Sequence, residues 1–128
     1  CRIVTTLYEI HGAYRREFYP RISMAVDKPP RILRCGIARG RVFSVGNSRD
    51  CIGHCINTAS RLQKLSLLTF CFPHRGFNVR EYMPEGYRRI FVQKRVSVRG
   101  VGEDELIWLR KEEFEKLPEK SRELFRNP

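Results

Sequence analysis

The sequence predicts one α+β domain, in which short strands pack against helices. Two observations lead to this prediction. Apolar residues recur at helical intervals in residues 2–19 and again in residues 53–65. Several short runs of β-branched and aromatic residues, bounded by glycine or proline, occupy much of the remaining chain. A length of 128 residues allows one domain with one core.

The first element is an amphipathic helix over residues 2–19. Its apolar side chains are Ile3, Val4, Leu7, Tyr8, Ile10, Tyr14 and Phe18. Proline inside a helix removes a hydrogen bond and clashes with the preceding turn, so we expect the helix to stop before Pro20. A loop follows at residues 27–30, Asp-Lys-Pro-Pro.

Two strands and a second helix come next. Residues 32–37 read as a strand that ends at Gly40, and residues 42–45 as a strand that pairs with it in a hairpin. The helix over residues 53–65 is expected to direct Ile56, Ala59, Ser60 and Leu62 toward the core. Residues 68–72 form a short continuous apolar run, which is typical of a buried strand.

The last third of the chain has strand patterns at residues 87–92, 95–99 and 105–109. A glycine-rich turn, Gly100-Val101-Gly102, separates the second of these from the third. Residues 111–128 form a charged tail with scattered apolar side chains, and we expect short helices there, packed on the outside of the domain.

The chain is strongly basic, with 25 lysines and arginines against 14 acidic residues and a formal charge of +11. Such a charge attracts a polyphosphate, a nucleic acid or an anionic membrane surface without choosing among them. The basic residues are spread along the whole chain and are not interleaved with aromatic residues, which speaks against a base-stacking nucleic-acid surface. No apolar run is long enough to span a bilayer.

The cysteine pattern indicates free thiols in a reducing cytoplasm, because five cysteines are an odd number and lie within apolar patterns. An alternative is a zinc site made by Cys51, His54 and Cys55, with Cys51 and Cys55 on one helical face. Structural zinc needs four ligands, and no second ligand cluster of suitable spacing follows. Buried free thiols are therefore the preferred interpretation.

Asn57 and Arg61 are the strongest candidates for a binding site. They are four residues apart in the predicted second helix, so they lie on one face and reach a single ligand together. An amide beside a guanidinium suits a phosphate. A structural alternative exists, since an exposed arginine often only solvates a helix face, and Asp50 can serve as a helix cap.

Three motifs within residues 33–65 resemble the C-terminal half of class III nucleotidyl cyclase domains. The motifs are Gly36-Ile37-Ala38-Arg39-Gly40, Asp50-Cys51-Ile52-Gly53-His54-Cys55-Ile56-Asn57 and Asn57-Thr58-Ala59-Ser60-Arg61. The resemblance covers residues 31–109 well and the helix before them loosely. It implies a ferredoxin-like sandwich, with a mainly antiparallel sheet and helices on one face. Residues 1–128 would be the C-terminal part of one such domain, incomplete at its N-terminus.

The resemblance also implies a reaction, in which the ribose 3′ hydroxyl of a nucleoside triphosphate, ATP being favoured, attacks the α-phosphate and releases pyrophosphate. At the positions that match the family's motifs, the resemblance implies that Arg61 stabilises the α-phosphate, Asn57 orients the ribose and Asp50 binds the base. The family uses Mg²⁺ or Mn²⁺ and works as a head-to-tail dimer with its sites at the interface. A cytoplasmic homodimer is therefore expected.

This chain departs from the family at two places. The aspartates that bind the metal ions would precede residue 2, so the metal ligands are expected to be absent from this chain. The chain alone is therefore not expected to catalyse the reaction. The family's phosphate-gripping lysine is replaced by Val101, which leaves Arg99 or another cation to supply that contact. Two alternatives to an active cyclase remain open, a catalytically silent nucleotide-binding or dimerisation module and a basic nucleic-acid-binding domain.

Overall fold

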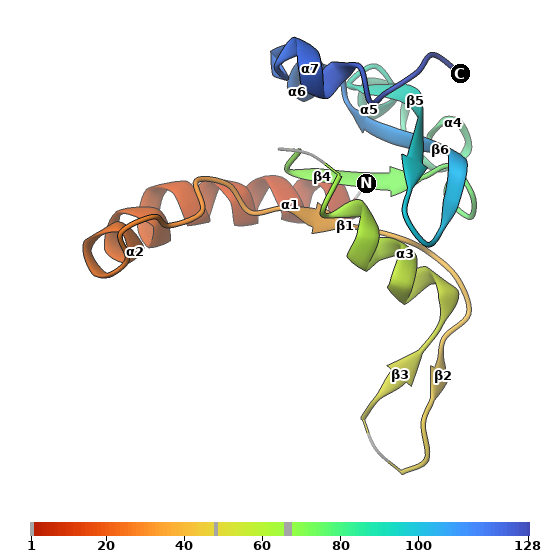
Figure 1. The fold of residues 1–128 in the computed structure, drawn as a ribbon, viewed down its shortest axis with the longest axis horizontal. Coiled ribbons are helices and arrows are strands. Elements are labelled where there is room, and N and C mark those ends of the chain that lie inside the picture. Colours follow the sequence, from red (N-terminus) through yellow and green to blue (C-terminus); the bar gives the residue numbers. More distant parts are fainter. Residues whose placement is uncertain (1, 48, 66–67) are drawn as a thin grey trace.

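The computed structural model of the chain describes residues 2–47, 49–65 and 68–128 and confirms the α+β class. A four-stranded sheet has the order β1-β4-β6-β5 (Figure 1). Its strands are β1 (Cys35–Gly36), β4 (Phe70–Pro73), β5 (Phe91–Val98) and β6 (Gly102–Arg110). β1 pairs with β4 in parallel, and the other neighbours are antiparallel. The sheet is therefore mixed.

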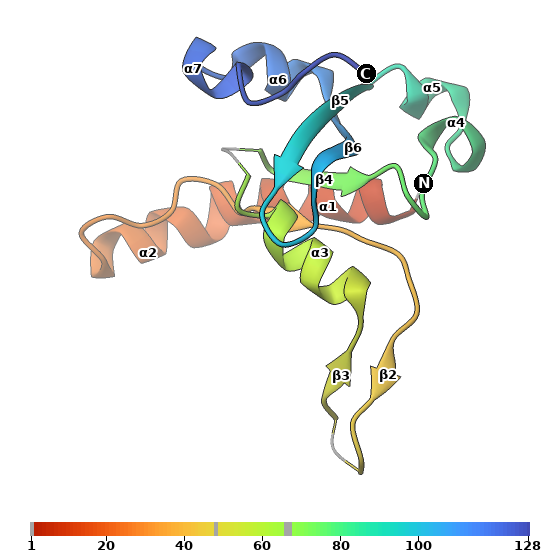
Figure 2. The same cartoon turned by 45° about the vertical axis from the view of Figure 1, so that its right-hand side comes forward.

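Helices cover both faces of this sheet, which corrects the prediction of helices on one face. Side chains alternate along a strand, so neighbouring residues of β4 and β6 enter different cores. One core contains Leu62, Leu68, Cys71, Val96, Val98, Ile107, Leu109, Leu117 and Phe125. The other contains Val4, Leu7, Phe70, Phe72, Val79, Met83, Phe91 and Trp108. The N-terminal helix and the helix that follows β3 accordingly lie on opposite sides of β4 (Figures 1 and 2).

The N-terminal helical segment continues past Pro20, where the sequence predicts its end. It consists of α1 (Arg2–Ala13), a π-helical turn (Tyr14–Phe18) and α2 (Tyr19–Ala25). Pro20 falls at the first or second position of α2. Proline is tolerated there because the N–H it lacks has no partner in a first helical turn. The change of hydrogen-bonding pattern at the π-helical turn therefore accommodates a residue that would break a regular helix.

The hairpin forms at a different place from the predicted one. Phe43–Ser44 (β2) pairs antiparallel with Cys51–Ile52 (β3), and neither strand belongs to the main sheet. The predicted strand at residues 32–37 contributes only β1, which pairs with β4 instead of with β2. We call residues 42–47 and 49–52 the arm, because β2 and β3 extend away from the sheet (Figures 1 and 2).

Helix α3 (His54–Leu62) lies directly against β1. A Cβ on Gly36 would lie 1.8 Å from the backbone oxygen of Ala59, so only glycine allows this approach. α3 buries Leu62, as predicted, and also buries Cys55 and Thr58, whereas the predicted core residues Ile56 and Ser60 are exposed. The Thr58 hydroxyl donates to the His54 carbonyl at 2.9 Å, which satisfies its hydrogen bonding inside the core.

The C-terminal part of the chain combines confirmed and corrected predictions. Residues 87 and 88 lie in a short helix, α5 (Glu85–Arg88), instead of a strand, because Pro84 and an acidic first turn favour a helix start. A further short helix, α4 (Val79–Tyr82), precedes it. β5 and β6 form the predicted hairpin around the glycine turn, with Gly100 at φ +76°.

The tail contains the predicted short helices, α6 (Lys111–Lys116) and α7 (Glu119–Arg122). It is not merely an outer layer, because Leu117 and Phe125 are buried in the core that α3 also enters. The backbone of Arg126 pairs with that of Arg95 on β5, with N···O distances of 2.8 and 2.9 Å. The tail thus closes one side of the sheet.

Candidate functional site

Helix α3 and the turn between β5 and β6 bring the two principal candidates together. The Asn57 side-chain amide donates to the Gly100 carbonyl, with an Nδ2···O distance of 3.4 Å. The position that a Cβ would take on Gly100 lies 3.9 Å from Arg61 Nε. Asn57 and Arg61 are both exposed, and both flank the same turn, 43 and 39 residues away in the sequence. The predicted shared face of Asn57 and Arg61 is therefore present.

Beside this turn lies a groove of about 420 Å³. We call it the clamp groove. Its lining residues are Arg61, Lys64, Leu65, Val96, Ser97, Val98, Arg99 and Leu124. The lining contains three cations and no carboxylate, and none of these cations is in an ion pair with another described residue. Guanidinium and ammonium groups in this state favour phosphate oxygens.

The predicted base-binding residue lies elsewhere. Asp50 is exposed on the arm, one residue before β3, where its backbone oxygen accepts from the Val45 N–H at 2.9 Å. It is not among the residues that line the clamp groove. Arg99, the predicted substitute cation, does line that groove. Within one chain, the structure thus brings Asn57, Arg61 and Arg99 together and leaves Asp50 apart.

A second, smaller cavity of about 230 Å³ is lined in part by Val101 of the β5–β6 turn. We call it the arginine cavity. Its lining residues are Ala38, Arg39, Gly40, Arg41, Phe43, His54, Cys55, Thr58, Pro73, Arg75, Val101 and Glu105. Sequence reasoning missed Arg41 and Arg75 as candidates, since neither belongs to a pattern with a chemical meaning and only the folded chain brings them together.

The side chain at position 101 is directed inward. Val101 is half-buried and packs against the core that contains Val98 and Leu109. The turn therefore offers no cation at this position. Arg99, the residue two positions before Val101, lines the clamp groove, whereas Arg75 lines the arginine cavity together with Val101.

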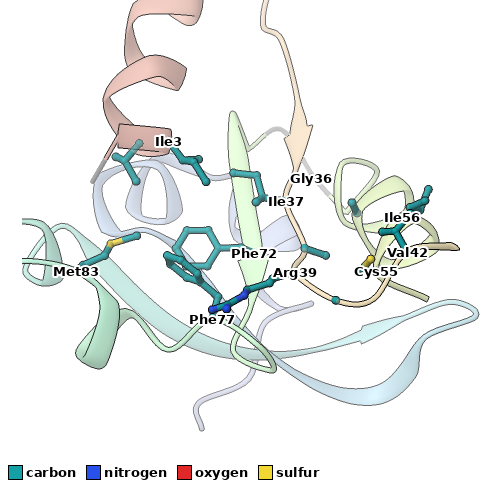
Figure 3. A pocket seen from close by; sticks show the side chains of 14 residues that line it. Ile3, Gly36, Ile37, Arg39, Val42, Cys55, Ile56, Phe72, Phe77 and Met83 are labelled. Carbon is teal, nitrogen blue, oxygen red and sulfur yellow. The ribbon is translucent and has the colours of Figure 1, made fainter. Parts of the chain in front are cut away.

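A third cavity, of about 650 Å³, is apolar (Figure 3). Ile3, Ile37, Phe72, Phe77 and Met83 are among its lining residues. Arg39 is its one charged lining residue, and the guanidinium carbon of Arg39 lies 5.7 Å from the centre of the Tyr82 ring. A wall with so few polar groups cannot neutralise a phosphate chain, so we do not place the charged ligand there.

The described residues contain no group of three or more histidine, cysteine or acidic side chains able to hold a metal ion. The zinc alternative therefore has no support. Cys51 lies on β3, not on the helix, and its thiol is exposed and donates to the Arg49 carbonyl at 3.8 Å. Cys55 is buried and donates to the Arg41 carbonyl at 3.6 Å. These contacts are those of ordinary thiols.

No protein-family model, curated protein or solved structure matches this chain. Among the described residues, none of the helices combines the length and the apolar composition that crossing a bilayer requires.

Proposed function

We propose that this chain is the C-terminal part of a nucleotidyl cyclase domain and binds the ribose and α-phosphate of a nucleoside triphosphate. The observation that carries the proposal is the meeting of Asn57 and Arg61 at the Gly100 turn, beside a groove lined by Arg61, Lys64 and Arg99. These residues come from two sequence segments that are far apart. Asn57 and Arg61 belong to the motifs that resemble the cyclase family, and the Gly100 turn lies within residues 31–109, which the resemblance covers.

The chemistry is an intramolecular displacement. The ribose 3′ oxygen forms a bond to the α-phosphorus, the bond to the bridging oxygen breaks, and pyrophosphate leaves with the electron pair while the hydroxyl proton passes to water. Negative charge grows on the α-phosphate and on the bridging oxygen. The Arg61 guanidinium donates to these oxygens, and the Asn57 amide, held against the turn, orients the sugar.

The intact domain would be a ferredoxin-like sandwich in a cytoplasmic homodimer, with ATP as the favoured substrate. Mg²⁺ or Mn²⁺ would neutralise the phosphates there. The described residues do not fit such an ion, since they contain no ligand cluster, and no step is assigned to it in this chain. Asp50 would contact the base only if the arm, on which it lies, meets the nucleotide in the assembled dimer.

One observation favours a second candidate function, a catalytically silent nucleotide-binding or dimerisation module. Val101 packs against the core at the turn where the family carries a phosphate-gripping lysine. Loss of a cation that contacts a transferring phosphoryl group lowers the rate far more than it lowers ground-state binding. A domain that still binds nucleotide without cyclising it would have this arrangement.

The test is the substitution Arg61→Ala, followed by calorimetric titration with ATP. We expect the affinity to fall about ten-fold or more, because a charge-assisted hydrogen bond contributes roughly 1.5–3 kcal/mol. Arg89→Ala is the matched control. It removes the same charge from an exposed side chain that pairs with Glu85 at 2.8 Å and lines neither cavity.

The outcomes separate the three functions. In the intact protein, an active cyclase loses cyclisation on Arg61→Ala, whereas a silent module loses only nucleotide affinity. A basic nucleic-acid-binding domain keeps its affinity for DNA or RNA, since one cation among many contributes little. Cyclisation at the wild-type rate in the Arg61→Ala protein would show that the proposed reaction is wrong.

A further inference from the structure

We propose that the arginine cavity is a second anion site, in which Arg75 and Arg41 bind the terminal phosphates of the nucleotide. This inference rests on the proposed nucleotide site and extends it. The cavity holds about 230 Å³ and is lined by these two arginines together with His54. Its ligand class is a polyphosphate chain whose first phosphate lies at Asn57 and Arg61.

Helix α3 contributes residues to both candidate sites. His54 and Thr58 of α3 line the arginine cavity, while Asn57 and Arg61, on the adjoining face of the same helix, flank the Gly100 turn. His54 and Asn57 are separated by about 4.5 Å along the helix axis at a rise of about 1.5 Å per residue. The two sets of residues therefore adjoin along one helix, which is the arrangement that a single polyphosphate ligand would need.

The charges in the cavity also favour an anion. Glu105 is the one carboxylate in its lining, and Arg75 Nη2 lies 3.8 Å from Glu105 Oε1. That separation is longer than a hydrogen bond, and the Arg75 side chain is 79% exposed, so its guanidinium is available to a ligand. Arg41 is exposed and in no ion pair with a described carboxylate.

Two other polar groups at the cavity have partners within the protein. The Thr58 hydroxyl donates to the His54 carbonyl at 2.9 Å, and the Arg39 guanidinium lies over the Tyr82 ring. The apolar side chain of Val101 forms the wall nearest the turn. Arg41 and Arg75 are thus the cations that the cavity offers to a phosphate beyond the clamp groove.

The experiment compares three probes on the full chain, namely AMP, ATP and inorganic tripolyphosphate. AMP reaches only the clamp groove, whereas ATP also reaches the arginine cavity. We expect Arg75→Ala and Arg41→Ala each to weaken ATP and tripolyphosphate binding about ten-fold, the loss typical of one charge-assisted contact, and to leave AMP affinity within about two-fold. Arg89→Ala serves again as the charge-matched control.

The substitution Glu105→Gln is expected to change the affinity for tripolyphosphate in the opposite direction. The Glu105 carboxylate repels an incoming phosphate and competes for Arg75, so removing its charge is expected to tighten tripolyphosphate binding about three-fold or more. Thermal unfolding of each variant checks that the fold is retained. Because Arg75 and Arg41 are exposed, their replacement is expected to leave the melting temperature nearly unchanged.

The results distinguish this inference from the proposed function. If Arg61→Ala weakens AMP and ATP while Arg75→Ala and Arg41→Ala change neither ATP nor tripolyphosphate binding, the second site is wrong and the proposed function stands. If AMP does not bind but tripolyphosphate binds in an Arg75-dependent way, the anion site stands without the nucleotide. Equal losses in Arg89→Ala and Arg75→Ala would reduce the effect to net charge and overturn the inference.

Discussion

Replacing Gly36 with alanine tests whether the close approach of β1 and α3 holds the domain together. The new Cβ would lie 1.8 Å from the Ala59 oxygen and 2.9 Å from the Gln63 nitrogen, both of which are backbone atoms. Ordinary van der Waals contact begins at 3.4 Å, so α3 must retreat by about 1.6 Å. Backbone atoms cannot rotate away as a flexible side chain does, and the strain therefore falls on the whole helix.

We expect Gly36→Ala to lower the free energy of unfolding by about 3 kcal/mol, at the upper end of the cost of overpacking a core. With a urea dependence of about 1.5 kcal/mol per molar, the unfolding midpoint falls by about 2 M. Circular dichroism and Trp108 fluorescence measure this change. ATP affinity is expected to fall as well, since a displaced α3 separates the Asn57 amide from the Gly100 carbonyl.

Gly86→Ala is the control for the same chemical change at another glycine. Gly86 lies in α5, and a Cβ there would meet nothing within 4 Å. Alanine in a helix is more favourable than glycine by about 0.5–1 kcal/mol, so this variant is expected to gain stability. If Gly36→Ala unfolds at the same urea concentration as the unchanged protein, the contact between β1 and α3 is not as close as described.

Two further predictions concern the cysteines. Burial, and to a smaller degree the Glu113 carboxylate, raises the pKa of Cys71 from 9.0 to about 12. Below pH 9 the Cys71 thiol is protonated in both the folded and the unfolded chain, and its contribution to stability is fully present. Between pH 9 and about pH 12 the unfolded chain loses a proton that the folded chain keeps, so the free energy of unfolding falls by about 1.36 kcal/mol per pH unit. Urea titrations across that window should lose this slope in Cys71→Ala, and an unchanged slope would contradict the assignment. In the folded protein a thiol reagent should modify exposed Cys51 and not buried Cys71, whereas equal labelling rates would show that Cys71 is accessible.

The parts of the fold that the sequence predicts best are those with a strong local pattern. The buried strand near Phe70, the hairpin of β5 and β6 and the position of α3 follow from apolar periodicity and glycine placement. The pairing of β1 with β4 is not predictable in this way, because it joins residues 35 and 70 and depends on the crossover through α3. Local patterns carry no information about such a register.

In the candidate site, too, some features follow from local sequence patterns and others depend on tertiary packing. The shared face of Asn57 and Arg61 follows from helix geometry alone. Their contact with Gly100 requires the packing of α3 against the β5–β6 turn, and the arrival of Arg75 beside Val101 requires the whole sheet. The apolar pattern predicts the burial of Leu62 but not that of Thr58, because Thr58 tolerates burial by donating its hydroxyl to the His54 carbonyl, which no hydrophobicity pattern reveals.

The arm has a thermodynamic consequence of its own. It has only two paired strands, and large apolar side chains on it are open to solvent, Phe43 at 62% and Ile52 at 60%. An isolated two-stranded ribbon is marginally stable in water, so the arm retains much of the conformational entropy that the sheet has already lost. Any contact that orders the arm must offset that entropy. The affinity of such a contact therefore depends on the stiffness of the arm as well as on the atoms that make the contact.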